Sequence, residues 1–149
     1  MRKNLHPEDL GDFLDQPKCA TLATHFKDGT ILMSPVWHEW KDGGFTVAVA
    51  SEDIKARHIR RDAKVSISVA EDSPPYRGIE VRGEASIERA DAFETTQRIA
   101  VRYLGAKQGA AYAEAFREAD LVLIRVKPGV LRAWDFADET ELSRDPQAG

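Results

Sequence analysis

Residues 19–51 read CATLATHFKDGTILMSPVWHEWKDGGFTVAVAS and contain two consecutive hairpin signals. Apolar runs flank Asp28-Gly29 and again Asp42-Gly43, and an Asp-Gly pair between such runs is typical of a tight turn joining antiparallel strands. Residues 45–50 then alternate large and small side chains with the period of two that a strand requires. This stretch therefore predicts antiparallel strands that are neighbours both in the sequence and in the sheet.

The rest of the chain adds further strands and several helices. Residues 64–70 and 79–88 alternate like strands, and two shorter strand candidates follow at 121–126 and 130–136. The helical candidates are Pro7–Asp15, Ser51–Arg61 with Ser51 as its cap, Ala90–Leu104 and Ala106–Asp120. Six or seven antiparallel strands with flanking helices predict a mainly β (α+β) protein built as a small β-barrel.

Length and composition favour one folded domain over residues 1–149. The chain has 149 residues, of which 42% are hydrophobic and 31% charged, values that suit a globular protein with a real core. Residues 137–149, at the C-terminal end, are acidic and are expected to form a flexible tail. No apolar run approaches the ~18–20 residues of a membrane-spanning helix, and the N-terminus lacks a signal-peptide core. We therefore expect a cytoplasmic protein without a membrane partner.

Charge and motif content exclude several classes of function. The net charge of −4 argues against nucleic-acid binding driven by overall basicity, although a local basic patch stays compatible with it. The sequence contains no GxSxG, P-loop, GxGxxG or HExxH motif. Its four histidines show no metal-ligand spacing, and a single cysteine rules out an internal disulfide. We expect no metal site, and no side chain is named as catalytic.

Two local patterns could bind a ligand. Residues 51–61 place Ser51 ahead of four cations, Lys55, Arg57, Arg60 and Arg61, which is typical either of a phosphate site or of a solvated charged helix face. In residues 33–38, Pro35 cannot donate a hydrogen bond to a neighbouring strand. The backbone around it could hold a flat heteroaromatic ring, or the segment could be an ordinary edge strand with a packed tryptophan.

The order of these patterns resembles the pyridoxamine 5′-phosphate oxidase-like (PPOX-class) flavin and deazaflavin oxidoreductases. The matching stretches are the one quoted above, KARHIRRDAKVSISVAED at 55–72 and PPYRGIEVRGEASI at 74–87, with residues 121–134 similar to the closing strands. The resemblance implies an FMN-binding type of split β-barrel and a homodimer with cofactor sites at the subunit interface. The cofactor-binding positions that it implies are Ser34, Pro35, Val36 and Trp37 for the ring, with Ser51, Lys55, Arg57 and His58 for the phosphate.

The resemblance also implies a reaction. Lys55-x-Arg57 and the short chain favour the deazaflavin coenzyme F420 over FMN, although His58 stands where the deazaflavin-using group usually has Asn. The chain lacks the longer C-terminal region of true pyridoxamine phosphate oxidases. The expected activity is hydride transfer from reduced F420 to a small electron-poor substrate. The alternatives are an FMN-dependent oxidoreductase, a flavin or haem binder without turnover, and a nucleic-acid-binding barrel.

Overall fold

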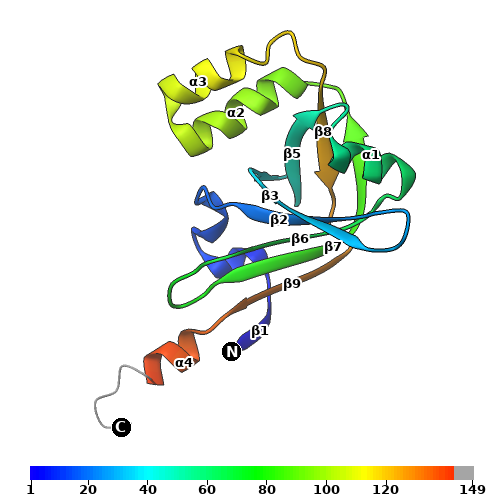
Figure 1. The fold of residues 1–149 in the computed structure, drawn as a ribbon. Coiled ribbons are helices and arrows are strands. Elements are labelled where there is room, and N and C mark those ends of the chain that lie inside the picture. The colour runs from blue at the N-terminus through cyan, green and yellow to red at the C-terminus, as the bar shows by residue number, and fades with distance from the viewer. Residues whose placement is uncertain (143–149) are drawn as a thin grey trace.

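A long central strand, β7, organises the molecule, and the computed structural model describes residues 1–142 (Figure 1). The strands are β1 (Arg2–Leu5), β2 (Ala20–His25), β3 (Ile31–Val36), β4 (Glu39–Lys41), β5 (Gly44–Ala50), β6 (Lys64–Ala70), β7 (Gly78–Glu88), β8 (Leu121–Val126) and β9 (Val130–Asp135). The α-helices are α1 (Ile54–Arg61), α2 (Ala92–Leu104), α3 (Ala106–Glu114) and α4 (Ala137–Leu142). Two 3-10 helices, η1 (Pro7–Leu10) and η2 (Phe13–Asp15), precede β2.

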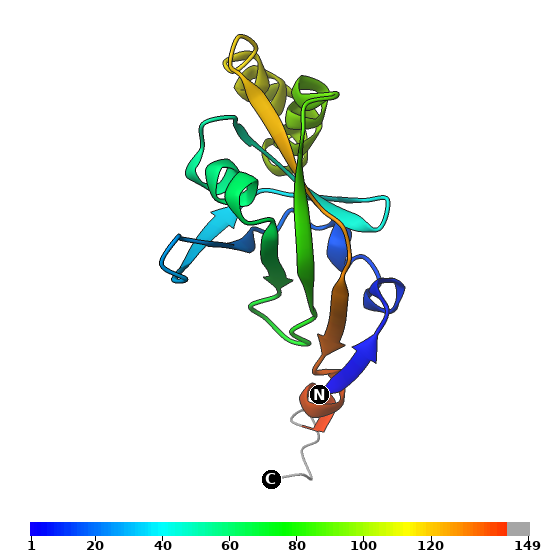
Figure 2. The same cartoon turned by 90° about the vertical axis from the view of Figure 1, so that its right-hand side faces the viewer.

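The sheet splits along β7. The first half of β7 pairs with β9 and its second half with β8, while β6 pairs along its other side (Figure 2). The strand order is β3-β2-β6-β7-β8-β5-β4, so β8 leads to β5 and β4 while β6 leads to β2 and β3. The segment between β8 and β9 passes so close to β7 that a Cβ on Gly129 would lie 2.5 Å from the Arg82 carbonyl oxygen. Only glycine permits this approach. The result is a curled split β-barrel.

The core lies inside the curl, where alternate strand residues converge. Leu22, Ile67, Val81 and Ile124 are fully buried, and Phe45 packs among them from β5. This is the period-two pattern that residues 64–70 and 79–88 predict, so both strands are confirmed within one residue of their expected bounds. The expected fold class, an antiparallel split barrel with flanking helices, is confirmed.

Residues 1–142 form nine strands, whereas the sequence predicted six or seven. The returning run at 31–40 is broken after Val36, which separates β3 from β4. The other unexpected strand is β1, whose residues are mostly exposed and show no apolar alternation. It joins the sheet through backbone pairing with β9 and through an ion pair between Arg2 and the buried Asp135 carboxylate. The hydrogen bond that the Arg2 side chain donates within this ion pair lowers the pKa of the Asp135 carboxyl group.

The helices also differ from the sequence prediction in their bounds. The helix expected over Pro7–Asp15 is two 3-10 turns interrupted at Gly11, whose φ of 61° requires glycine-like freedom. Helix α1 begins at Ile54 rather than near Ser51, and α3 ends at Glu114 rather than Asp120. The acidic segment expected as a flexible tail begins as α4, where Asp138 and Glu139 pair with the N-terminal amine. Residues 143–149 lie outside the described part of the chain. No helix within residues 1–142 is both long and apolar enough to cross a membrane.

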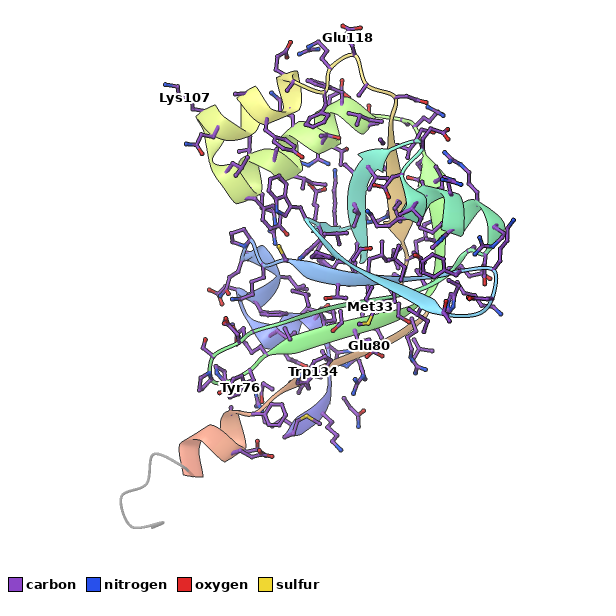
Figure 3. All side chains as sticks on the ribbon, in the orientation of Figure 1. Met33, Tyr76, Glu80, Lys107, Glu118 and Trp134 are labelled. Atoms are coloured by element: carbon purple, nitrogen blue, oxygen red, sulfur yellow. The ribbon has the colours of Figure 1, made fainter. Side chains whose placement is uncertain are left out.

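The outer face of the sheet carries exposed apolar side chains at one edge. On edge strand β3 the side chains of Ile31 and Met33 are 55% and 69% exposed. Figure 3 shows Met33, Glu80 and Trp134, from β3, β7 and β9, following one another across this outer face. Glu80 pairs there with Arg82 and with Arg132, so the far side of the face is charged and the β3 side is apolar.

His38 makes the fold sensitive to acid. Its side chain is 1% exposed, and neither ring nitrogen has a hydrogen-bond partner among residues 1–142. Burial, with a smaller contribution from the nearby Arg102 charge, lowers its pKa from 6.5 to about 4. The folded state therefore favours neutral His38. The stability this residue contributes is complete above pH 6.5 and is lost as the pH falls from the unfolded pKa toward 4.

We expect His38→Leu to remove this acid sensitivity. Relative to the wild type, the variant should gain about 3 kcal/mol of unfolding free energy as the pH is lowered from 7 to 4. This value is the free-energy equivalent of the pKa shift of His38. Urea unfolding of both proteins at several pH values measures it. The exposed His6, replaced by Gln, is the control and should track the wild type. Parallel pH profiles for wild type and His38→Leu would show that His38 titrates normally in the folded protein.

Candidate functional site

A cavity of about 380 Å³ lies between the sheet and the hairpin formed by α2 and α3, and we call it the hairpin cavity. Its lining residues come from β5, the end of β3, the start of α1 and the α2–α3 region, and Figure 1 shows the α2–α3 hairpin beside β5 and β8. Its lining comprises Pro35, Val36, Trp37, residues 47–50, Asp53, Lys55, Thr96, Ile99, Tyr112, Phe116 and Leu121. Most of these side chains are apolar, and Lys55 supplies a positive charge.

Trp37 is held rigidly in the cavity wall. Its ring stacks on Tyr103 of α2, with 4.9 Å between ring centroids and 8° between planes, and it meets Tyr112 of α3 at 5.2 Å. The Tyr103 hydroxyl accepts a hydrogen bond from the His38 backbone N–H at 3.0 Å and donates one to the Lys18 carbonyl at 2.8 Å. The helix hairpin thus fixes the break between β3 and β4. The wall is preorganised by stacking and by backbone hydrogen bonds.

Lys55 enters the hairpin cavity from the first turn of α1. The Asp53 carboxylate caps this helix by accepting a hydrogen bond from the Lys55 backbone N–H at 2.8 Å. The same carboxylate lies 2.9 Å from the Lys55 ammonium, whose side chain is only 15% exposed. The pair therefore holds the ammonium beside the helix N-terminus, whose partial positive charge also favours an anion.

Ser51 is buried beside this site instead of capping the helix. Its hydroxyl accepts hydrogen bonds from Arg60 at 2.8 Å and from Arg89 at 3.3 Å, and Arg60 also donates to the Ser51 carbonyl at 2.6 Å. Arg89 in turn pairs with Asp120. This network fixes the loop between β5 and α1, so Ser51 supports the cavity without lining it.

The predicted site residues fall into separate groups. Pro35, Val36, Trp37 and Lys55 come together in the hairpin cavity. Arg57 and His58 line a second hollow. Arg57 points away from the hairpin cavity because residues two positions apart on a helix, here Lys55 and Arg57, point about 200° apart. Ser34 lies half-buried in β3 opposite Leu22 and lines neither space.

His58 has a structural contact of its own. It is 5% exposed, and its Nδ1 lies 2.9 Å from the Thr24 hydroxyl of β2. Burial, followed by the charges of Arg61 and Arg57, lowers its pKa. This hydrogen bond ties α1 to the sheet, and that contact explains why a ring with hydrogen-bonding capacity is accommodated at a buried position.

Sequence reasoning missed the part of the cavity that α2 and α3 supply. Residues 106–120 suggested only an Ala-rich helix, yet Tyr112 and Phe116 border the cavity with their rings 5.0 Å apart. Their spacing of four residues is typical of side chains on one helical face and could have been noticed, although Phe116 lies just beyond the end of α3. The sequence did not indicate that Asp53 caps α1, because Ser51 is also a residue type that is common at helix caps.

The arrangement suits a flat conjugated ring that carries an anionic group. Apolar strand atoms and the Trp37 ring would enclose the flat part, and Lys55 with the helix start would meet the charge. Within residues 1–142 no group of three His, Cys, Asp or Glu side chains is placed to hold a metal ion.

Comparisons with known proteins agree with this fold. The chain is similar to an F420 reductase of known structure, with 26% identity, a TM-score of 0.67, and coverage of 85% of this chain and 98% of that one. It is also similar in fold to the conserved hypothetical protein Rv2991 from Mycobacterium tuberculosis (24% identity, TM-score 0.75, coverage 91% and 88%). A FAD-binding protein from Mesorhizobium loti shares the fold at 17% identity, with a TM-score of 0.63 and coverage of 89% and 93%.

Comparison of the sequence alone identifies the family of the chain. A search of curated proteins finds no match. The family model described as pyridoxamine 5′-phosphate oxidase matches residues 7–135, which include every strand except β1 and the whole lining of the hairpin cavity. The chain therefore belongs to the pyridoxamine 5′-phosphate oxidase family of flavin-binding oxidoreductases.

Proposed function

We propose that this protein is an oxidoreductase that binds coenzyme F420, or alternatively FMN, with the cofactor ring in or at the mouth of the hairpin cavity. The observation that carries the proposal is the meeting of a preorganised aromatic wall at Trp37 with the ammonium of Lys55 in one largely apolar cavity. A bound flavin or deazaflavin supplies a ring that accepts or delivers a hydride. The similarity to an F420 reductase favours the deazaflavin.

The chain's own residues would orient the ring and exclude water. Val36 and the β5 residues 47–49 present an apolar surface, while Trp37 closes one side. Lys55 would hold the phosphate. Its ammonium, which pairs with the Asp53 carboxylate, would then be shared between that carboxylate and the phosphate. The substrate is expected to be a small electron-poor molecule, because the hairpin cavity is small and lined mostly by apolar side chains.

Titration with each cofactor tests the proposal. We expect the absorption spectrum of F420 to change on adding protein and to saturate at one cofactor per chain, with weaker binding of FMN. Reduced F420 should then be oxidised only when an electron-poor acceptor is present. Saturable binding without turnover would assign the protein as a non-catalytic cofactor binder, and tighter binding of FMN would overturn the choice of F420. No binding of either cofactor would reject the proposal.

Replacing each of the two cations of the Lys-x-Arg motif should weaken cofactor binding to a different extent. Lys55→Ala should weaken cofactor binding by about 1.5–3 kcal/mol, the scale of a hydrogen bond to a charged group. Arg57→Ala should have a much smaller effect, because Arg57 faces the second hollow. Isothermal titration of the two variants with F420 gives both values, and thermal melting of the apo-proteins checks that they remain folded. Equal losses would mean that the phosphate spans both sides of α1.

We also propose that the protein is a homodimer that covers the outer face of the sheet. The apolar stripe of Ile31, Met33 and Pro35 lies on an edge strand, where exposed apolar side chains favour pairing with another chain. The family resemblance supports the same arrangement. The charged pairs around Glu80 would form the polar part of such an interface.

Sedimentation equilibrium measures the oligomeric state. The expected mass is twice the 16.6 kDa of the chain, and Met33→Glu should shift the protein toward the monomer because it places a charge in the apolar stripe. Glu118→Lys, an exposed charge change beside the helix hairpin, is the control and should stay dimeric (Figure 3). A wild-type mass near 16.6 kDa at micromolar concentration would contradict the dimer.

A further inference from the structure

The two helices of the hairpin are attached to the protein in different ways, and α2 is the firmly held one. Arg98 of α2 forms an ion pair with Glu39 of β4, with a hydrogen bond of 3.0 Å. Arg102 donates to the carbonyl groups of Leu14 and Gln16 at 2.8 and 2.6 Å. Five residues of α2 are also buried, where the helix contacts β5 and β8. Charged hydrogen bonds and a buried face thus fix α2 to the barrel.

Helix α3 and the turn that follows it, residues 106–119, lack such anchors, and we call them the α3 segment. Figure 1 shows α3 on the outer side of α2. Only Gly109 and Ala113 of α3 are buried, and the Gly109 backbone lies against Val101 of α2. Among the described residues, no side chain of the α3 segment forms a hydrogen bond or an ion pair with a residue outside it. Small residues and aromatic contacts therefore hold the segment in place.

The two ends of the α3 segment allow it to move as a unit. Gly105 joins the helices with a φ of 86°, and among the described residues no atom beyond its chain neighbours lies within 4 Å of the position that a Cβ would take. Backbone rotation at Gly105 therefore meets no obstacle. At the other end Asp120 is fixed, because its side chain pairs with Arg89 and its carbonyl accepts a hydrogen bond from the Ser51 N–H at 2.8 Å.

Helix α3 has little stability of its own. It is nine residues long, Gly105 at its start provides no side-chain cap, and Gly109 lies in its middle. Isolated helices shorter than ~12–15 residues are marginal in water, and an internal glycine weakens them further. The α3 segment should therefore open at a lower free energy than the rest of the protein.

The contact between Tyr112 and Trp37 holds the α3 segment over the hairpin cavity. The two ring centroids are 5.2 Å apart and the planes meet at 50°. Trp37 is a fixed partner because it also stacks on Tyr103. Tyr112 and Phe116 line the cavity but are 41% and 40% exposed, values that are high for aromatic side chains. A flat ligand in the cavity would cover both rings, so ligand binding should favour the closed position.

We propose that the α3 segment is a lid that opens and closes over the hairpin cavity, with Gly105 and Asp120 as its ends and the contact between Tyr112 and Trp37 holding it closed. Opening admits a ligand, and closure brings Tyr112 and Phe116 onto it. The proposal rests on the proposed function only for the identity of the ligand that favours the closed lid.

Hydrogen exchange of the cofactor-free protein tests whether the segment opens by itself. Under conditions where exchange reports the opening equilibrium, we expect the hydrogen-bonded amides of α3 to exchange at least ~100-fold faster than those of α2. Equal exchange in the two helices would mean that the hairpin opens only as one body, and it would overturn the proposal.

Tyr112→Ala tests the contact that holds the lid closed. Exchange in α3 should become at least ~10-fold faster, the scale of a lost aromatic pair, while exchange in α2 stays the same. Alanine forms helices better than tyrosine, so intrinsic propensity alone would slow the exchange. Lys107→Ala, at an exposed position of α3, is the matched control and should not exchange faster than the wild type (Figure 3). Unchanged exchange in Tyr112→Ala would overturn the role of the Tyr112 contact.

Exchange in the presence of cofactor tests the link between closure and binding. With saturating F420, or with FMN if only FMN binds, exchange in α3 should slow at least ~10-fold. Exchange in the β1–β9 pair, which contributes nothing to the cavity lining, should stay the same. Cofactor binding without slower exchange in α3 would overturn closure on the ligand. Absence of binding by either cofactor would reject the proposed function instead, and the comparison of α3 with α2 would still decide whether the segment is a lid.

Discussion

Ala50→Trp is expected to abolish cofactor binding while leaving the protein folded. Ala50 ends β5, is exposed, and lines the hairpin cavity, so an indole there would occupy a large part of its 380 Å³. Exposure of the native side chain means that the substitution need not disturb the core. The affinity for F420, or for FMN if that is the ligand of the wild type, should fall at least ~100-fold, about 2.7 kcal/mol. Titration with the cofactor and thermal melting of the same sample give the two readouts.

Ala70→Trp is the matched control for this prediction. Ala70 is also an exposed alanine at the end of a strand, β6, but it does not line the hairpin cavity. Both variants add the same indole to a strand end, so any general effect on folding should appear in both. Normal cofactor affinity in Ala50→Trp would mean that the ligand does not enter the hairpin cavity, and the assignment of this cavity to the cofactor would fail.

Gly109→Val is expected to destabilise the protein and to move α3 away from α2 and from the hairpin cavity. Gly109 lies in α3 where the helix crosses α2, and a Cβ at this position would lie 2.4 Å from the Val101 Cα. Backbone cannot yield as a flexible side chain does, so the two helices must move apart. We expect a loss of about 3 kcal/mol in unfolding free energy, the scale of an overpacked core position. Tyr112, three residues further on, would move away from Trp37 and cofactor binding should weaken as well.

Ala111→Val on the same helix isolates the steric effect. Ala111 is exposed, so its valine adds β-branching to α3 without contact with α2. Valine is a better helix former than glycine, and intrinsic propensity alone would therefore make Gly109→Val slightly stabilising. Urea unfolding of the two variants separates these effects. Equal stability of Gly109→Val and the wild type would show that the helices of the hairpin can separate at little cost.

The sequence by itself determined the antiparallel barrel, because its signals are local. Asp-Gly turns between apolar runs specify which strands are neighbours, and period-two alternation in β6 and β7 specifies which face is buried. The Ala90–Leu104 helical pattern and its closing Gly105 locate α2 within two residues for the same reason. The order of the Pro35 strand and the basic helix was also sufficient to indicate the family, which the match over residues 7–135 confirms.

Only the tertiary structure decided how the candidate site is assembled. Pro35, Trp37 and Lys55 share a cavity because β5 and α1 bring two distant segments together, whereas Arg57 turns away although it lies two residues from Lys55. Ser51 looked like a helix cap, but long-range hydrogen bonds from Arg60 and Arg89 bury it in a supporting network. The cover supplied by Tyr112 depends on the packing of α3 against α2 and Trp37. Side-chain direction and long-range packing are properties of the folded chain, and a pattern read over ten residues does not contain them.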